Sequence, residues 1–264
     1  MIGLFLGDKN LPIEILKKLK TKKIQYFIVD LTKNNKFKKD KNCFFINIGK
    51  FGKILKLIHS KRCKKVIFAG NISKPKFSTL KLDIKGIYYI PRIIKAYKLG
   101  DAAILKELIR ILAEHKIKVI KLNSFNPELT LSKGNYSKLK PNNIENLQIK
   151  NGIKYLNKLN SYNYTQGIVL RNNKVIAKES SKGTKKMLQQ LRKTKFINSG
   201  MLIKFPKKKQ DLRVDLPTVG IDTLKDCKKA KIKGIVLKSK ENIILDKNKC
   251  ISFANKNNMF IAVK

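Results

Sequence analysis

The chain begins with the stretch I-G-L-F-L-G-D-K-N-L-P, residues 2–12, which decides the fold of its first half. Ile2–Leu6 is almost entirely apolar, which is typical of a strand buried on both faces. Leu11-Pro12 predicts the start of a helix, because the first helical turn does not need the N–H that proline lacks. The stretch therefore indicates a strand, a turn at Gly7 and a helix.

The same alternation continues through the first half of the chain. Further apolar runs predict strands at Tyr26–Val29, Cys43–Ile46, Val66–Ala69 and Val119–Leu122. Apolar residues at helical spacing predict one helix around Phe51–Ile58 and another that Asp101 caps. Short apolar strands that alternate with helices favour a parallel sheet with helices on both faces.

Ligands bind such sheets at the carboxyl ends of the strands. Those ends are Gly7-Asp8-Lys9, Gly49–Gly52 and Gly70-Asn71. Residues 49–53 lack the spacing of a P-loop, G-x-x-x-x-G-K-[ST]. The residues alone leave two interpretations open at these glycines, an ordinary turn or a contact with a ligand.

The second half predicts a mixed α/β domain. Residues 123–146 are rich in Asn, Ser, Pro, Gly and Lys, which indicates a connector, and we expect domains at 1–130 and 151–264 with the connector at 131–150. Gln166–Leu170 and Lys174–Lys178 predict a hairpin. The other expected elements are a helix near Gly152–Leu159, a helix around Thr184–Leu191, strands at Gly200–Lys204, Gly234–Leu237, Ile243–Leu245 and Met259–Val263, and a helix near Lys247–Asn257.

The charge of the chain is strongly positive. Its 264 residues include 61 Lys and Arg against 17 Asp and Glu, a formal net charge of +44. Arginine, the usual residue for bidentate contacts with bases, occurs at only six positions, and lysine is spread over the whole chain. This distribution is typical of a protein from an AT-rich genome and disfavours specific nucleic-acid binding. It favours salt-dependent attraction to anionic lipid or to nucleotide phosphate.

Several classes are disfavoured by what the sequence lacks. The first residues do not have the basic region and long apolar core of a signal peptide, and no apolar run reaches the ~18 residues that span a bilayer. Cys43, Cys63, Cys227 and Cys250 are widely spaced, which argues against disulfides or a zinc cluster and fits a reducing cytoplasm. His59 and His115 are interpreted as ordinary helix residues.

The segment K-F-P-K-K-K-Q-D-L-R-V-D-L-P-T-V-G, residues 204–220, carries the most chemistry. In an extended segment Asp211, Arg213 and Asp215 would lie on one face, because side chains alternate with a period of two. Carboxylates bind Mg²⁺ and guanidinium groups bind phosphate oxygens, so this row predicts a phosphate site with a metal ion. A solvated row of ion pairs is an equally good interpretation of the spacing.

Five segments in order resemble the LpxI family, the UDP-2,3-diacylglucosamine pyrophosphatases of Gram-negative lipid A biosynthesis. They are I-G-K-F-G-K-I-L-K (48–56), F-A-G-N-I-S-K-P-K-F (68–77), G-D-A-A-I-L (100–105), Q-G-I-V-L (166–170) and Q-D-L-R-V-D-L-P-T-V-G (210–220). Each segment alone is weakly specific, since glycine turns recur across α/β folds. Their order and separation carry the resemblance, which runs over nearly the whole chain.

The resemblance implies an enzyme with a Rossmann-like N-terminal domain, a different C-terminal α/β domain and a ligand cleft between them. Members cleave the pyrophosphate of UDP-2,3-diacylglucosamine in a Mg²⁺-dependent reaction, giving UMP and 2,3-diacylglucosamine 1-phosphate (lipid X). Water is expected to attack the sugar-side phosphorus. The resemblance also implies a cytoplasmic protein that is peripheral at the inner face of the inner membrane.

The resemblance assigns roles to particular residues. Asp215 takes the position of the family's catalytic aspartate, as a metal ligand or as the base for water, and Arg213 suits charge stabilisation on the phosphoryl group. Asp211 is either a further ligand or a residue that orients Arg213, and Glu179 is expected to be a metal ligand. The expected substrate contacts are Gly7, Leu11, Pro12, Gly52, Lys53, Gly70, Asn71, Gln166, Gly183, Thr184, Lys204, Lys207 and Thr218.

The sequence also departs from the family pattern. The family's Glu-Gly-Thr-Asp is replaced here by Lys182-Gly183-Thr184-Lys185, and its Gly-Asp-Asp is replaced by Gly100-Asp101-Ala102. The loss of two acids beside the expected phosphate site leaves two alternatives open. One is a non-catalytic protein that binds a nucleotide-lipid or another polyanion, and the other is a lysine-rich nucleic-acid binder. The sequence does not fix the oligomeric state.

Overall fold

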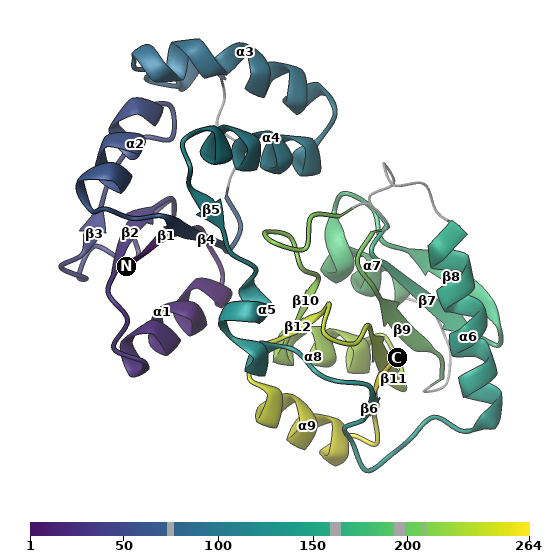
Figure 1. Ribbon diagram of the computed structural model, residues 1–264. Coiled ribbons are helices and arrows are strands. Elements are labelled where there is room, and N and C mark those ends of the chain that lie inside the picture. Colours follow the sequence, from purple (N-terminus) through teal and green to yellow (C-terminus); the bar gives the residue numbers. More distant parts are fainter. Residues whose placement is uncertain (73–76, 159–164, 193–198, 208–209) are drawn as a thin grey trace. The chain divides into compact units, whose positions relative to one another are not determined.

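The computed structural model describes residues 1–72, 77–158, 165–192, 199–207 and 210–264. The chain forms two compact units, Met1–Asn126 and Pro127–Lys264 (Figure 1). Each unit is an α/β structure built on its own sheet, so the expected fold class is confirmed. Residues 73–76 of the segment 68–77, Leu159 of the expected helix and residues 208–209 of the segment 204–220 lie outside the described residues.

The first unit is built on a parallel sheet with the strand order β3-β2-β1-β4-β5. This order places β1 at the centre and confirms the Rossmann-like prediction. Phe5 of β1 lies beside Phe68 of β4, and their rings stack at 4.8 Å between centroids. The elements are β1 (Ile2–Leu6), α1 (Leu11–Thr21), β2 (Tyr26–Asp30), β3 (Cys43–Phe44), α2 (Phe51–Ser60), β4 (Lys65–Ala69), η1 (Phe77–Thr79), α3 (Ile84–Lys98), α4 (Asp101–Glu114), β5 (Lys118–Val119) and α5 (Leu122–Phe125).

Three details of the first unit differ from the expectations. Gly100, with φ 100°, is the N-cap of α4, and Asp101 is the first helical residue, so the expectation that Asp101 caps this helix is wrong. The last strand ends at Val119, because Leu122 already begins α5. Helix α3 was not expected, and it contains Pro91 in its interior.

The second unit is built on a mixed sheet with the order β6-β13-β11-β9-β7-β8, in which β13, β11 and β9 are parallel. Strands β6, β7 and β8 run antiparallel to their neighbours, and β7 and β8 form the expected hairpin. Strands β10 and β12 form a small parallel pair. The elements are η2 (Pro127–Leu129), β6 (Gly134–Asn135), α6 (Asn143–Lys158), β7 (Gly167–Arg171), β8 (Lys174–Lys178), α7 (Gly183–Leu191), β9 (Met201–Lys204), β10 (Thr218–Val219), α8 (Ile221–Lys229), β11 (Gly234–Leu237), β12 (Ile243–Ile244), α9 (Lys247–Lys256) and β13 (Phe260–Val263).

Residues 131–150, which the composition indicates as a connector, contain regular structure of the second unit. Gly134 and Asn135 form strand β6 and pair with Val263 and Ala262 of β13. Helix α6 begins at Asn143. Asn142 and Glu145 exchange hydrogen bonds between side chain and backbone at this helix start, both of 2.8 Å.

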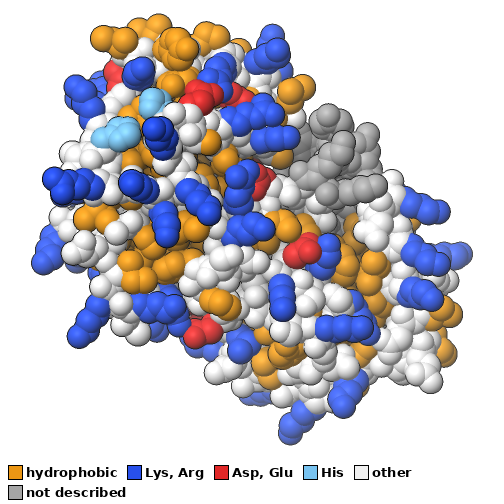
Figure 2. All heavy atoms as spheres, viewed as in Figure 1, with side chains coloured by type: hydrophobic (Ala, Val, Ile, Leu, Met, Phe, Trp, Pro, Cys, Tyr) orange, Lys and Arg blue, Asp and Glu red, His pale blue; other side chains and the backbone are white. Residues whose placement is uncertain are grey.

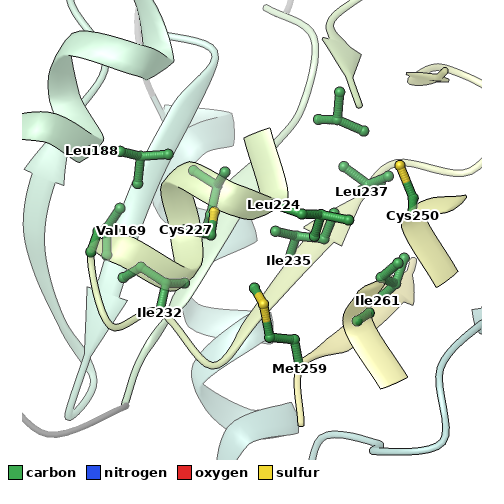
Figure 3. Close-up of a cluster of buried hydrophobic side chains, with 14 of the residues drawn as sticks. Val169, Leu188, Leu224, Cys227, Ile232, Ile235, Leu237, Cys250, Met259 and Ile261 are labelled. Atoms are coloured by element: carbon green, nitrogen blue, oxygen red, sulfur yellow. The ribbon is translucent and has the colours of Figure 1, made fainter. Parts of the chain in front are cut away.

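The core of the second unit lies on both faces of its sheet, because alternate residues of each strand point to opposite sides. Leu202 and Ile235 pack with apolar residues of α7, α8 and α9, the cluster shown in Figure 3. Their neighbours Ile203 and Val236 pack on the other face with Ile149 of α6. The sheet is therefore the middle layer of three, and only its edges and strand ends remain for polar chemistry.

The cysteines, the helices and the two histidines can be compared with the expectations from the sequence. The four cysteines are free thiols. Within the described ranges, no helix is both long enough and apolar enough to cross a membrane. The hydroxyl of Tyr89 lies 2.9 Å from Nε2 of His115, which follows α4, and the ring of His59 in α2 lies 6.3 Å from that imidazole.

Candidate active site

The carboxyl ends of β1 and β4 meet at the centre of the first sheet, where a Rossmann-like fold binds ligands. Asp8 and Asn71 form an antiparallel bridge there, with backbone N···O distances of 2.8 and 3.0 Å. A Cβ atom at Gly7 would lie 2.4 Å from the carbonyl oxygen of Asn71. The structure thus brings the predicted residues Gly7, Gly70 and Asn71 together. The close approach of the Asn71 backbone leaves no room for a side chain at position 7, which explains the glycine there.

Gly70 has a second constraint, since its φ is 92° and a Cβ atom would lie 2.6 Å from Pro12 Cγ. Leu11 and Pro12, also predicted substrate contacts, are buried in the first turn of α1. Their side chains therefore pack inside the first unit. The turns that follow β1 and β4 present backbone groups at this edge together with the exposed side chains of Lys9 and Asn71.

The backbone N–H groups of Gly52 and Lys53, predicted to contact a nucleotide, are bound by Asp83. Each lies 3.0 Å from a carboxylate oxygen of Asp83, which also accepts from Gly86 N at 2.8 Å. Burial opposes the charge on Asp83, but these hydrogen bonds outweigh it and lower the pKa of the carboxyl. Asp83 therefore satisfies the first turns of both α2 and α3, and the two N–H groups already have an anionic partner.

The strongest polar cluster of the second unit lies at the carboxyl end of β9. Lys204 ends this strand and is only 4% exposed. Its Nζ donates to both carboxylate oxygens of Glu179, at 3.0 and 3.3 Å, and to Thr184 Oγ1 at 2.7 Å. Glu179 is 8% exposed, so this is a buried ion pair with a hydroxyl as third member. The structure thus unites three predicted site residues.

The sheet explains why these residues meet. Gly167 at the start of β7 pairs with Lys204 at the end of β9, and Glu179 N donates to Gly167 O at 2.8 Å just after β8. A Cβ atom at position 167 would lie 2.8 Å from Glu179 Oε2, so glycine makes room for the carboxylate. Phe205 N also donates to Gln166 O, which holds the predicted residue Gln166 at the same edge. The start of β7, the end of β8 and the end of β9 therefore converge here.

Helix α7 directs its first turn toward this cluster. Gly183 and Thr184 are its first two residues, and no side chain caps its N-terminus. Gly183 has φ 80°, and a Cβ atom there would meet nothing within 4 Å. The exposed Lys182 and Lys185 flank this turn. Gly183 N already donates to Ser180 O at 2.9 Å, so the N–H groups that follow it in this turn, the helix dipole and the lysines are what favour an anion at this position.

The expected row of Asp211, Arg213 and Asp215 along an extended segment is wrong. Residues 212–214 form a turn, in which Asp215 N donates to Asp211 O at 3.1 Å. The carboxylate of Asp211 accepts from the backbone N of Arg213 at 3.0 Å and from its guanidinium at 2.6, 2.9 and 3.2 Å. These hydrogen bonds raise the pKa of Arg213. Asp211 thus holds the Arg213 guanidinium, and its role as a further metal ligand stays a prediction.

Gln210 ties this turn together, a role that the sequence analysis did not assign. Its Oε1 accepts from Lys207 N at 2.8 Å, and its Nε2 donates to the backbone oxygen of Asp215. The half-buried Asp215 is thereby fixed through its main chain. Thr218, another predicted contact, uses its hydroxyl to donate to Leu216 O at 3.1 Å. Gln210 begins segment 210–220, one of the five that carry the resemblance to the LpxI family, and that position was the available signal.

Metal binding by protein side chains alone does not fit the residues present. Among the described residues, no three His, Cys, Asp or Glu side chains gather to hold an ion, and the remaining segments contain none of these residue types. Both oxygens of Glu179 face the Lys204 ammonium, and both oxygens of Asp211 face Arg213. The donor set allows the looser mode common for Mg²⁺, in which one or two carboxylates, waters and substrate phosphates share the ion.

Comparison with known proteins identifies the family of the chain. The model of the LpxI N-terminal domain matches residues 1–129, and that of the LpxI C-terminal domain matches residues 132–262. The chain belongs to the LpxI family. The UDP-2,3-diacylglucosamine pyrophosphatase LpxI of Caulobacter vibrioides is 30% identical over 223 residues, which cover 82% of this chain and 80% of that protein. The two LpxI domain matches meet within a few residues of the boundary between the compact units.

Proposed function

We propose that this chain hydrolyses the pyrophosphate of UDP-2,3-diacylglucosamine to 2,3-diacylglucosamine 1-phosphate (lipid X) and UMP in lipid A biosynthesis. LpxI membership and the name of the Caulobacter relative support the substrate. The observation that carries the proposal is the buried Lys204–Glu179–Thr184 cluster beside the uncapped start of α7. A buried cation at the carboxyl edge of a sheet, next to helix N–H donors, is a site for phosphate oxygens.

Lys204 and the first turn of α7 would hold the phosphoryl oxygens. Glu179 and Thr184 hold the Lys204 ammonium in one position, and a phosphoryl oxygen would take over one of its N–H groups from these acceptors. The surplus positive charge at the site then comes from the helix dipole and from Lys182 and Lys185. These groups stabilise a diphosphate in the ground state, and the ammonium also stabilises the charge that grows on the phosphoryl group during reaction.

The turn at residues 210–215 would supply the remaining chemistry. Asp211 fixes the guanidinium of Arg213 in a defined direction, which suits a donor for a second phosphoryl oxygen. Gln210 fixes the main chain at Asp215, whose carboxylate would orient and deprotonate the attacking water. In the proposed step the water oxygen bonds to the sugar-side phosphorus, the bond from that phosphorus to the bridging oxygen breaks, and UMP leaves with the bridging oxygen.

A divalent cation, Mg²⁺ in the first instance, belongs to the proposal. Asp215 would hold it together with the oxygens of the diphosphate, the mode that the donor set allows. Bound there, the ion would screen the phosphate charge and make water more acidic. Glu179 is the other predicted ligand, and it can take that role only if Lys204 moves away from its carboxylate.

The substrate also gives the proposal a place in the cell. The acyl chains of the substrate are inserted in a bilayer, whereas its UDP group and the product UMP are water-soluble cytoplasmic nucleotides. We therefore place the protein in the cytoplasm, peripheral at the inner face of the inner membrane. The excess of lysine supports attraction to the anionic lipid of that surface.

The test is the release of UMP from purified chain, UDP-2,3-diacylglucosamine and Mg²⁺, with EDTA as the metal control. In water enriched with ¹⁸O, the label should enter lipid X and not UMP. Asp215→Asn should reduce turnover at least about a hundredfold while circular dichroism stays unchanged. Asp222→Asn is the matched control, because Asp222 is an exposed carboxylate of the same unit in α8. Absence of UMP with every divalent metal tried would refute the enzymatic proposal.

One second candidate rests on a specific observation, the pair of lysines at the start of α7. A protein that binds a nucleotide-lipid without cleaving it would gain affinity from Lys182 and Lys185, and tight binding of intact substrate without UMP release would identify it. A general nucleic-acid binder would instead lose affinity steeply with salt and show no preference for the UDP-sugar over a polyanion.

A further inference from the structure

Helix α3 of the first unit carries an apolar face that points to solvent. Four large side chains on it are strongly exposed, Ile84 at 86%, Tyr88 at 68%, Leu99 just after the helix at 65% and Ile87 at 60%. Residues 84, 87, 88, 91, 95 and 99 follow the three- and four-residue spacing of one helix face. We call this set the outward face of α3.

The opposite side of α3 already supplies the packing that the fold needs. Gly86, Tyr89 and Ala96 are buried, and the helix packs on α4 and α2 (Figure 1). Arg92 holds it to α4 through Glu107 at 2.7 Å and Glu114 at 2.6 Å. A surface helix normally needs one apolar stripe, so the second stripe has no partner within the described unit.

The charges on α3 itself are all basic. Lys85, Lys95 and Lys98 belong to the same helix, and none of them pairs with a carboxylate in the described parts of the chain. Figure 2 shows apolar side chains over α3 at the top of the view, with basic side chains beside them. Of the acids nearby, Asp83 accepts from backbone N–H groups of α2 and α3, and Glu107 and Glu114 are bound by arginines, whereas Asp101 is exposed at the start of α4. The face is therefore apolar and cationic together.

We propose that the outward face of α3 docks on a bilayer surface that contains anionic lipid. Isoleucine, leucine and tyrosine enter the boundary between headgroups and acyl chains, and lysines reach the lipid phosphates. Tyr88 has both characters, since its ring lies 5.8 Å from the Lys85 ammonium. A second copy of the chain is a poorer partner, because a symmetric contact would bring the lysines of both copies together. The inference draws on the proposed function for one point, that a diacylated substrate must be collected from lipid.

The first experiment is flotation with vesicles of phosphatidylcholine containing about 30% phosphatidylglycerol, compared with pure phosphatidylcholine. The wild-type chain should float with the anionic vesicles, and Ile87→Ser/Tyr88→Ser should weaken that binding about tenfold or more. The matched control is Ile144→Ser/Leu147→Ser in α6, where the side chains are 69% and 59% exposed. Equal loss in both double variants, or in neither, would overturn the assignment to α3.

The second experiment tests the charge. Lys95→Gln/Lys98→Gln should reduce binding to anionic vesicles more than Lys225→Gln/Lys229→Gln, which removes two exposed lysines from α8. Added salt should weaken the wild type and should weaken the Lys95/Lys98 variant less. If the two lysine variants behave alike, the net charge of the chain and not this face is responsible, and the proposal fails.

The third experiment compares turnover on dispersed and on membrane-bound substrate, which distinguishes an effect on docking from an effect on catalysis. On substrate dispersed in a neutral detergent, Ile87→Ser/Tyr88→Ser should turn over as the wild type does, whereas on substrate in anionic vesicles it should be slower. If the chain releases no UMP in any format, the proposed function fails and the flotation result still decides the docking. Light scattering completes the test, since a dimer that this variant converts to monomer would assign the face to a second copy instead.

Discussion

Lys204→Met is the perturbation that the structure predicts most sharply. The ammonium of Lys204 is buried against both oxygens of Glu179 and against Thr184 Oγ1. Methionine has a similar length and removes only the charge and its N–H donors. The variant therefore leaves the Glu179 carboxylate buried in the second unit without the cation that balances it.

The size of the effect follows from that burial. Removing one partner of a buried ion pair destabilises a protein by about 3–5 kcal/mol, because the remaining charge has lost its compensation. For a unit of this size we expect a melting temperature about 10–20 °C lower. Replacing both partners should be much milder, since the buried charge disappears. Glu179→Gln/Lys204→Met should thus recover most of the loss.

The assay is urea unfolding followed by far-ultraviolet circular dichroism, with hydrogen exchange to read the second unit separately. Lys225→Met, at an exposed position of α8, is the control and should change the unfolding free energy by less than about 0.5 kcal/mol. Turnover should be lost in both Lys204 variants, even where Glu179→Gln restores stability. This split separates the role of Lys204 in the fold from its proposed role in binding phosphate.

Two results would refute this reasoning. If Lys204→Met were as stable as the wild type, the ammonium and the carboxylate would not form the buried pair seen here. If the double variant were stable and still turned over substrate at the wild-type rate, Lys204 would have no part in phosphate binding.

Other contacts lead to further expectations. Asp83→Asn should lower the stability of the first unit by about 1–3 kcal/mol at pH 7. Because folding lowers the pKa of Asp83, this stabilisation is present above its unfolded pKa of about 4 and disappears at lower pH, so urea titrations at pH 7 and pH 3 should show a shrinking difference. Gly70→Ala should cost about 1–3 kcal/mol in thermal unfolding, since φ is 92° and the Cβ would crowd Pro12, whereas Gly220→Ala, with no contact closer than 3.6 Å, should cost less. Gln210→Ala should lower kcat about tenfold or more with little change in stability, because it loosens the turn that carries Asp215.

Much of the fold followed from local pattern. The strands Ile2–Leu6, Lys65–Ala69 and Gly234–Leu237 are buried over most of their length, so apolar runs in the sequence marked them directly. The hairpin followed from Asn172 and Asn173, which adopt φ of 48° and 59° in its turn. Helix α3 escaped prediction because apolar residues on both of its faces, together with Pro91, hide the amphipathic period.

The candidate site was less predictable, because its decisive contacts are either very local or very distant. The extended row predicted at 211–215 is wrong because the Asp211 side chain accepts a hydrogen bond from the backbone N of Arg213 and bends the chain into a turn. Aspartate side chains often form such local hydrogen bonds in place of regular secondary structure. The Glu179–Lys204 pair joins residues 25 positions apart through the register of three strands, which composition does not reveal. Asp83 was detectable in principle as an aspartate before a helix, but its bonds to α2 arise only from the packing of the two helices.

The scarcity of acids in this chain makes their positions informative. With 61 basic residues against 17 acidic ones, a lysine at a surface position needs no special explanation, but a retained carboxylate does. Glu179 cannot change to lysine without placing two ammonium groups together in the interior, whereas Lys182 and Lys185 are exposed and no carboxylate is needed there for folding. The basic composition of the chain would account for the lysines around α7 without reference to the site, so the buried pair is the better basis for the proposal about what the site binds. Lys182→Glu/Lys185→Asp should then leave stability unchanged, and a rise in turnover would show that acids at these two positions contribute to phosphate or metal binding.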